Sequence, residues 1–306
     1  MKSILITGSS GFIGKYLSKY FLNKNYLVYG ISRSSPNNEL IKNFTQYFSS
    51  KSSEKDLSNF INKCKPDYIF HCAGRTLVKE SFNNPSADFK DNTIMTFEFL
   101  NIVKNFSPES KIFFFSSAAV YGNPNYLPID ENFNTLPLSP YGFHKMLAEE
   151  ICREFSEVYS LRIVILRIFS AYGEGLRRQI FYDLMNKFHY MPEVKLKGSG
   201  SETRDFIHVF DLCRAIEIIM NTNNNFLDIY NVATGEETSI KGLAEMISEV
   251  INSDKKIVFD NIPNKGMPIN WRADITKLKK LGFNKAVDIS EGIEKYVKWF
   301  SKENLM

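Results

Sequence analysis

Short apolar runs alternate with amphipathic stretches along the first half of the chain. Five runs have the length and composition of buried parallel strands, and the stretches between them carry apolar residues at helical spacing. The strands are expected at Ile4–Ile6, Leu27–Ile31, Tyr68–Phe70, Ile112–Ser116 and Ile163–Arg167. The helices are expected at residues 15–24, 55–63, 86–106 and 141–158. This alternation predicts an α/β fold, a doubly wound parallel sheet with helices on both faces.

The pattern changes near residue 170. Loops lengthen after that point, and helical stretches at 241–252 and 289–302 alternate with short strand-like runs. We therefore expect the sheet domain to occupy residues 1–170, with a later segment at about 205–235 returning to it. Residues 171–306 are expected to form mainly a smaller mixed lobe.

The first expected strand runs directly into a glycine-rich turn, and a helical pattern begins after it. Such a turn presents backbone N–H groups and the positive end of a helix to a phosphate. Gly8 permits the tight turn, Gly11 lets a pyrophosphate approach, and Gly14 lets helix and strand pack closely. The residues predicted to bind a dinucleotide here are Gly8, Ser10, Gly11, Phe12, Ile13 and Gly14. The alternative is a glycine turn without a ligand.

The second expected strand ends at Ser32 and Arg33, where no acidic side chain is present. In dinucleotide-binding folds an acid about 20 residues past the glycines hydrogen-bonds the ribose hydroxyls of NAD. A guanidinium and hydroxyl groups would instead attract the 2′-phosphate of NADP. We predict that Ser32 and Arg33 bind the cofactor and that NADP(H) is favoured, with NAD(H) possible. The alternative is that Arg33 stacks on the adenine or faces water.

Three polar residues are candidates for proton transfer. Tyr141 and Lys145 lie four residues apart in an expected helix, so they share one face. A nearby ammonium lowers the pKa of a phenol, and a tyrosine so placed can exchange protons at neutral pH. Ser117 follows an apolar strand, where its hydroxyl can share the substrate oxygen with the tyrosine. The alternatives are a solvated helix face for the pair and a turn residue for Ser117.

Charge and cysteine content narrow the classes of function. The 306 residues carry a net charge of +4 with both signs interspersed, so we expect no nucleic-acid partner. No apolar stretch is long enough to cross a bilayer, and a strand begins at residue 3, so we expect neither a membrane span nor a signal peptide. The cysteines lack metal-ligand spacing, which predicts no metal site and a reducing, cytoplasmic location. They are Cys64, Cys72, Cys152 and Cys213.

Seven segments, taken in chain order, make a specific combination. They are Thr7–Gly14, Pro66–Gly74, Ser116–Gly122, Ser139–Lys145, Arg167–Gly173, Arg204–Val209 and Ala273–Asp274. Together they resemble the nucleotide-sugar branch of the extended short-chain dehydrogenase/reductase family, over essentially the whole chain. The resemblance implies a Rossmann domain over residues 1–170 and a C-terminal lobe that holds a nucleoside-diphosphate sugar. It also implies reversible hydride transfer between a sugar carbon and the nicotinamide.

The resemblance also implies roles for individual residues. Tyr141 corresponds to the general acid/base, Lys145 to its partner that also binds the nicotinamide ribose, and Ser117 to the hydroxyl on the substrate oxygen. Further cofactor contacts are implied for Cys72, Ala73, Gly74 and Asn92, beside His71, which we interpret as a satisfied strand-end histidine. Substrate contacts are implied for Ser117, Ser170, Arg178, Arg204 and Lys265. Arg204 suits a diphosphate, and the alternative is an ion pair with Asp205 or another acid.

Three positions depart from the family pattern. The 4,6-dehydratases carry an Asp-Glu pair where this chain has Ala118 and Ala119, which cannot transfer a proton, so dehydration is not expected. Ser170 stands where members usually have asparagine, which puts a substrate contact there in doubt. Lys265 stands near a position usually held by arginine, and it would be a less directional partner for a diphosphate.

Three functions are compatible with these residues. The main hypothesis is a reductase in which NADPH reduces a 4-keto(-6-deoxy) nucleoside-diphosphate sugar, because an acid is missing at Ser32. The alternative is a 4-epimerase similar to UDP-glucose 4-epimerase, which uses the same triad. The third is a redox-inactive binding protein, against which the intact triad argues. Family members often dimerise through the helix that carries the tyrosine and the long helix before Ser117, so we expect a homodimer.

Overall fold

The computed structural model describes residues 1–33, 38–49, 54–222 and 225–304. Its contacts divide the chain into two compact units. The first consists of Met1–Gly122, Asn134–Arg167 and Thr222–Tyr230, and the second of Asn123–Phe133, Ile168–Asn221 and Asn231–Met306. The predicted boundary between a sheet domain and a lobe near residue 170, with its returning segment at about 205–235, stays a prediction.

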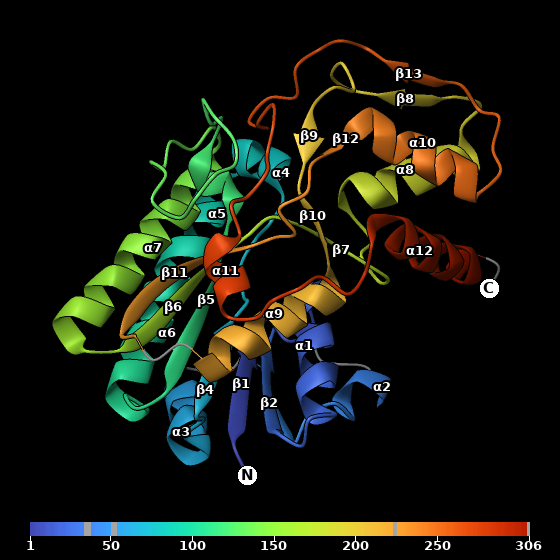
Figure 1. Ribbon diagram of the computed structural model, residues 1–306. Helices are drawn as coiled ribbons and strands as arrows, with labels where there is room; N and C mark the ends of the chain where they lie inside the picture. Colours follow the sequence, from blue (N-terminus) through green and yellow to red (C-terminus); the bar gives the residue numbers. More distant parts are fainter. Residues whose placement is uncertain (34–37, 50–53, 223–224, 305–306) are drawn as a thin grey trace. The chain divides into compact units, whose positions relative to one another are not determined.

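A seven-stranded sheet is the centre of the first unit (Figure 1), with the strand order β11-β6-β5-β4-β1-β2-β3. The pairs that connect β3 through to β5 are all parallel. The strands are β1 (Ser3–Thr7), β2 (Leu27–Ser32), β3 (Gln46–Ser49), β4 (Tyr68–His71), β5 (Lys111–Ser117), β6 (Arg162–Ile168) and β11 (Leu227–Val232). The helices are α1 (Phe12–Leu22), α2 (Asn38–Ile41), α3 (Glu54–Cys64), α4 (Val78–Asn83), α5 (Pro85–Phe89), α6 (Met95–Phe106) and α7 (Pro140–Tyr159). This is the predicted doubly wound fold of the Rossmann type.

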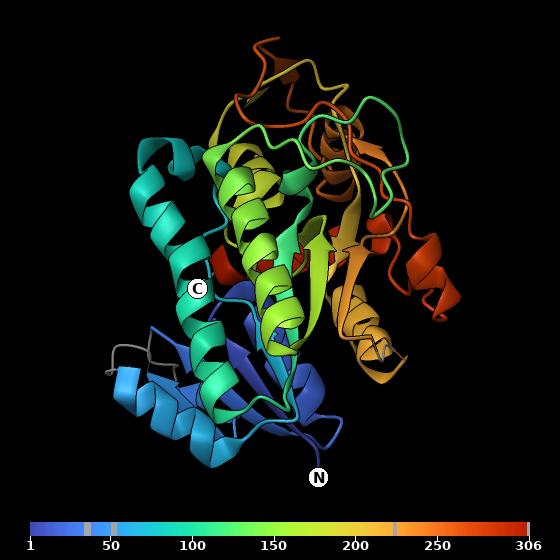
Figure 2. The ribbon, with the colours of Figure 1, turned by 90° about the vertical axis from the view of Figure 1, so that its left-hand side faces the viewer.

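Helices cover both faces of this sheet. On one face, α3, α6 and α7 pack over alternate strand residues such as Leu5, Ile69 and Phe114, and Figure 2 shows α6 and α7 side by side. On the other face, the ring of Phe21 from α1 lies 5.1 Å from that of Phe70 on β4. Because the strands are buried on both faces, they have the continuous apolar composition from which they were predicted.

The structure differs from the predicted elements in three places. Strands β3 and β11 are not among the five predicted, because β3 (Gln46–Ser49) is half exposed and polar at its ends. Helix α1 begins at Phe12, directly after the glycine turn. The single helix predicted over 86–106 is α5 and α6 joined by a π-helical turn at Lys90–Ile94. A π turn has one residue more than an α turn, which apolar periodicity does not reveal.

The second unit contains short strands and five helices among the described residues. Parallel pairs join β7 with β10 and β8 with β13, and β9 pairs with β12 in the antiparallel sense. The strands are β7 (Ser170–Tyr172), β8 (Val194–Leu196), β9 (Thr203–Arg204), β10 (Phe206–His208), β12 (Thr238–Ser239) and β13 (Ile257–Phe259). The helices are α8 (Gln179–Tyr190), α9 (Val209–Thr222), α10 (Ile240–Val250), α11 (Thr276–Lys280) and α12 (Ile289–Asn304). Within the described ranges, no helix has the length and apolar character that crossing a membrane requires.

Candidate active site

The glycine turn between β1 and α1 is packed as tightly as its sequence predicts. Gly8 has a φ of +66°, and a Cβ there would lie 2.9 Å from the backbone of Ala73. A Cβ on Gly14 would lie 2.5 Å from the carbonyl oxygen of Gly8. Any side chain at either position would therefore push the start of α1 away from the sheet.

The same turn has the features of a pyrophosphate site. Gly11 is the N-cap of α1, and no side chain caps the helix there. The first turn of α1 contains no acidic residue, so the positive helix end stays uncompensated by its own sequence. A side chain on Gly11 would meet only the Gly8 carbonyl oxygen, at 3.0 Å, so the turn is open on its outer side. Ser10 hydrogen-bonds Ser32 and thereby ties the turn to the end of β2. These residues fit a dinucleotide.

His71 at the end of β4 supports the site but does not serve as its acid or base. Its Nδ1 lies 2.9 Å from the Thr7 hydroxyl, and its ring stacks on Phe99 at 4.6 Å. Burial, followed by the charge of Lys145, lowers the pKa of His71 to about 3, so the ring is neutral at physiological pH. Thr7 also accepts the N–H of Ala73 at 3.2 Å, which positions the segment Cys72–Gly74 beside the glycine turn. The interpretation of His71 as a satisfied strand-end histidine agrees with these contacts.

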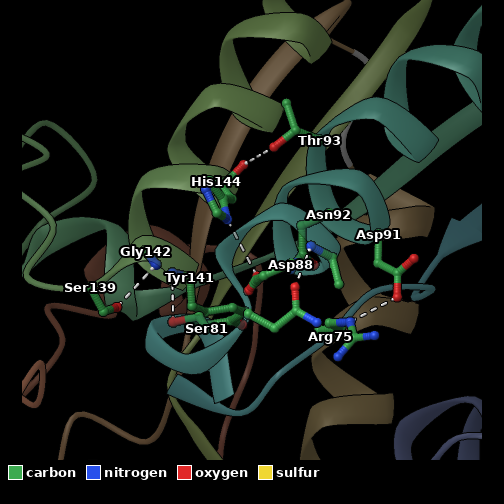
Figure 3. A network of polar contacts seen from close by, with 12 residues as sticks. Arg75, Ser81, Asp88, Asp91, Asn92, Thr93, Ser139, Tyr141, Gly142 and His144 are labelled. Carbon is green, nitrogen blue, oxygen red and sulfur yellow. Dashed lines mark hydrogen bonds and ion pairs between the residues drawn. The ribbon is translucent and has the colours of Figure 1, made fainter. Parts of the chain in front are cut away.

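Asn92 belongs to a buried polar cluster at the π turn (Figure 3). Its Nδ2 donates to Asp88 Oδ2 at 2.7 Å, and His144 Nδ1 lies 3.4 Å from that same oxygen. Asn92 Oδ1 has no hydrogen-bond partner in the described part of the chain. A Cβ on Gly74 would lie 2.5 Å from it, so Asn92 faces the loop predicted to flank the cofactor. Asn92 thus lies beside Gly74.

The N-terminus of α7 is fixed by caps that also orient Tyr141 (Figure 3). Ser139 Oγ accepts the N–H of Gly142 at 3.2 Å, and Ser81 Oγ accepts the N–H of Tyr141 at 3.1 Å. Pro140 occupies the first helical turn, where its missing N–H costs nothing. A Cβ on Gly142 would lie 2.6 Å from the carbonyl oxygen of Ala119. Glycine therefore allows the helix start to approach the turn that follows β5.

Lys145 is buried beneath Tyr141 on the same face of α7. Its Nζ donates to the Phe115 carbonyl oxygen at 2.6 Å and lies 4.7 Å from the Phe114 ring centre. Burial lowers the pKa of Lys145 to about 8, against smaller opposing effects of Cys152, Glu149 and Cys72. Ser117, two residues after Phe115, ends β5, and its Oγ accepts the N–H of Ala119 at 3.2 Å. The three predicted catalytic residues are thus held by one strand end and one helix.

A buried ion pair next to this triad was not predicted. Arg167 on β6 donates to Glu149 Oε2 at 2.7 Å, and its Nη1 donates to the Tyr121 hydroxyl at 3.1 Å. Ser116 donates a further hydrogen bond to Glu149. The signal that could have found this pair is Arg167 itself, since an arginine in an apolar strand requires a buried acid.

The predicted substrate residues other than Ser117 belong to the second unit. Arg204 is buried, its Nη1 donates to the carbonyl oxygens of Thr203 (2.6 Å) and Ile269 (3.1 Å), and its Cζ lies 5.5 Å from the Trp271 ring centre. Burial lowers the pKa of Arg204 to about 10. In the described chain no carboxylate lies within salt-bridge distance of it.

Asp205, the alternative partner for Arg204, is engaged elsewhere. Its carboxylate accepts the N–H groups of Thr234, Gly235 and Ala273 at 2.8–3.2 Å. The guanidinium of Arg204 is therefore available for an anionic ligand. Of the remaining predicted substrate residues, Ser170 and Arg178 are half-buried and Lys265 is exposed.

Among the described residues, no group of three or more His, Cys, Asp and Glu side chains is arranged to hold a metal ion.

Comparison with known proteins identifies the family of the chain. Residues 4–233 match the model of the NAD dependent epimerase/dehydratase family. A putative UDP-glucose 4-epimerase of Methanocaldococcus jannaschii is 32% identical over 98% of this chain and 99% of its own. The UDP-glucose 4-epimerase of Thermotoga maritima, solved with UDP-glucose, has a TM-score of 0.90 and 28% identity, and the alignment covers 99% of both chains.

A further similar structure contains both a nucleotide sugar and NAD. The UDP-glucuronic acid 4-epimerase of Bacillus cereus, in complex with UDP-glucuronic acid and NAD, has a TM-score of 0.88 and 26% identity, covering 98% of this chain and 99% of that one. These relatives confirm the predicted nucleotide-sugar branch and an enzyme that uses a nicotinamide cofactor. They do not support the main hypothesis of a 4-ketoreductase, and they favour the stated alternative, a 4-epimerase. The preference for NADP is likewise not supported and stays a prediction.

Proposed function

The chain belongs to the NAD-dependent epimerase/dehydratase family, and within it we propose that this protein is a UDP-sugar 4-epimerase. The similarity to 4-epimerases over nearly the whole chain favours this activity over reduction. The structural observation that carries the proton transfer is the buried ammonium of Lys145, held against Phe115 on the same helix face as Tyr141. This arrangement moves a proton to and from a single sugar oxygen. Ala118 and Ala119, both buried, provide no second acid or base for dehydration.

In the proposed reaction, residues of the chain first remove a proton from the sugar hydroxyl and later return it. Bound NAD supplies a reversible hydride acceptor at the sugar carbon. Tyr141 removes the proton of the C4 hydroxyl as the hydride leaves, and Ser117 hydrogen-bonds the same oxygen. The positive charge of Lys145 stabilises negative charge on the oxygens beside it. After the ketone has presented its other face, Tyr141 returns the proton and the inverted alcohol forms.

The diphosphate is proposed to bind in the second unit. Arg204 is the best candidate, because its buried guanidinium has no acid partner in the described chain, and a diphosphate would supply the missing charge. We also propose that Ser170, Arg178 and Lys265 contact the substrate, as the family pattern predicts.

The four cysteines form no disulfide in the structure, which supports a reducing, cytoplasmic location.

We also propose a homodimer built on α6 and α7. Among the large apolar side chains exposed in the first unit are Phe97 on α6 and Phe143 and Leu147 on α7, at 42–48% exposure. Exposed apolar side chains gathered on two adjacent helices indicate a contact surface.

The decisive experiment supplies UDP-glucose, UDP-galactose, UDP-glucuronic acid and UDP-galacturonic acid separately, with no added cofactor. An epimerase interconverts a 4-epimeric pair, and the denatured protein releases stoichiometric NAD. Tyr141→Phe should abolish interconversion while the variant retains NAD. Consumption of NADPH with a 4-keto-6-deoxy sugar, without interconversion of any pair, would instead establish the reductase.

A further inference from the structure

The end of β2 carries no acidic residue of its own, but the carboxylate of Asp91, on the π turn, lies close to it. Asp91 Oδ2, on the π turn, lies 3.2 Å from Arg33 Nη1, directly after β2. The same oxygen accepts Arg75 Nε at 2.9 Å (Figure 3). The Asp91 side chain is 16% exposed, whereas that of Arg33 is 66% exposed. One shielded carboxylate is therefore shared by two guanidinium groups, of which that of Arg33 is the more exposed.

The position of this cluster relates it to the cofactor. Arg33 follows Ser32, whose hydroxyl contacts Ser10 in the glycine turn. Arg75 follows Gly74, the residue that Asn92 touches, and Asp91 precedes Asn92. The three charged residues thus come from the segments that carry the predicted cofactor contacts, at the strand ends where the ribose of the adenosine half binds in such folds.

From this geometry we infer that Asp91 shifts the choice of cofactor towards NAD, because its carboxylate occupies Arg33 and lowers the positive charge that a 2′-phosphate would meet. A 2′-phosphate bound to Arg33 would bring a second anion onto a guanidinium that already holds a carboxylate. The two anions would repel each other at short range, in a site only partly screened by water. NAD has no phosphate there and meets no such repulsion. The inference rests on the proposed use of NAD, and it explains why an arginine at the end of β2 is compatible with that cofactor.

Arg75 has a distinct part in this arrangement. Its Nε donates to the Asp91 oxygen that Arg33 also contacts, at 2.9 Å, and its side chain is 35% exposed. Because Asp91 is anchored by Arg75, it cannot turn into solvent when an anion approaches Arg33 without losing a charged hydrogen bond. Asp91 is thus a specificity residue, and Arg75 is its positioning residue.

The test measures the dissociation constants of NAD⁺ and NADP⁺ by calorimetry, on protein freed of bound nucleotide, for wild type and Asp91→Asn. Asparagine keeps the size and an acceptor oxygen but removes the charge. We expect wild type to prefer NAD⁺, and Asp91→Asn to improve NADP⁺ binding by about tenfold while NAD⁺ changes less than threefold. The double variant Asp91→Asn, Arg33→Ala should lose the improvement in NADP⁺ binding, because the 2′-phosphate no longer has the Arg33 guanidinium to bind.

A matched control removes a carboxylate elsewhere. Glu245→Gln breaks the exposed pair with Lys241 on α10 and should leave both affinities unchanged. The inference is overturned if wild type prefers NADP⁺, if Asp91→Asn leaves the ratio of the two affinities within twofold, or if the gain survives Arg33→Ala. Failure of wild type to bind either nucleotide would overturn the proposed function as well, so the two failures are distinguishable.

Discussion

Ser116 donates a hydrogen bond to Glu149, and this contact joins the strand that ends at Ser117 to the helix that carries Tyr141. Glu149 lies one helical turn beyond Lys145 and two beyond Tyr141, so all three share a face of α7. Arg167 closes the arrangement from β6. The distance between the serine and the tyrosine is therefore set by a buried ion pair that does not itself take part in the chemistry.

Arg167→Met should be strongly destabilising. It leaves the Glu149 carboxylate buried without its cation, which costs about 3–5 kcal/mol in comparable cases. The measurement is urea unfolding of the variant against wild type. Lys187→Met, which breaks the more exposed pair with Asp183, is the control and should cost less than about 1 kcal/mol. An equal, small effect of both substitutions would show that the buried pair does not fix β6 to α7.

Lys145 should make the stability of the protein depend on alkaline pH. Its pKa is about 8 in the fold and 10.5 in the unfolded chain, so the unfolded state binds more protons between these values. The contribution of Lys145 to the free energy of unfolding therefore rises as the pH passes from 8 towards 10.5. Below pH 8 the full cost of burying the ammonium is present.

The comparison of wild type with Lys145→Met isolates this effect. Between pH 7.5 and 9.5, the free energy of unfolding of wild type should rise by about 2 kcal/mol relative to the variant. The variant is needed because other groups titrate in the same range. Parallel pH curves for the two proteins would mean that Lys145 is not desolvated in the fold.

Gly142 and Gly242 form a matched pair at the starts of two helices. Each donates its N–H to a serine N-cap, Ser139 or Ser239. A Cβ on Gly142 would meet the Ala119 backbone at 2.6 Å, whereas one on Gly242 would meet only the Ser239 hydroxyl at 3.0 Å. Gly142→Ala should therefore cost about 2 kcal/mol and lower kcat, because it pushes Tyr141 away from Ser117.

Gly242→Ala serves as its control. Alanine is the better helix former, so this change should be neutral or stabilise by up to about 1 kcal/mol in the same unfolding experiment. If both alanines behave alike, the close approach of α7 to the turn after β5 is not a constraint on the protein.

The proposed dimer surface predicts a change in size in solution. Leu147→Glu puts a charge on α7 beside Phe143 and should convert a dimer into a monomer in sedimentation experiments. Ile262→Glu alters a more exposed apolar residue in the second unit and should leave the dimer intact. A wild-type protein that sediments as a monomer at all concentrations would exclude this surface as the interface.

The sequence predicts what is encoded locally and misses what depends on partners far along the chain. The glycine turn, the five central strands and the Tyr141–Lys145 spacing are local patterns, and all are present in the structure. The pair Glu149–Arg167 is 18 residues apart and lies within segments that are otherwise amphipathic or apolar. Its geometry follows from packing α7 on the sheet, which no window of sequence contains.

The choice between NAD and NADP is a second property that depends on a partner far along the chain. The residues after β2 suggest NADP when they are considered alone, because the acid that recognises NAD is absent. The carboxylate that faces Arg33 comes from Asp91, 58 residues later. A rule based on distance from the glycines cannot find it.

The π turn at Lys90–Ile94 places two neighbouring residues in different surroundings, with Asp91 against the arginines and Asn92 against Gly74 and Asp88. Deleting one residue there would restore an ordinary helix, yet it would rotate everything before it by about 100° relative to α6. The segment therefore tolerates substitution more readily than a change in length.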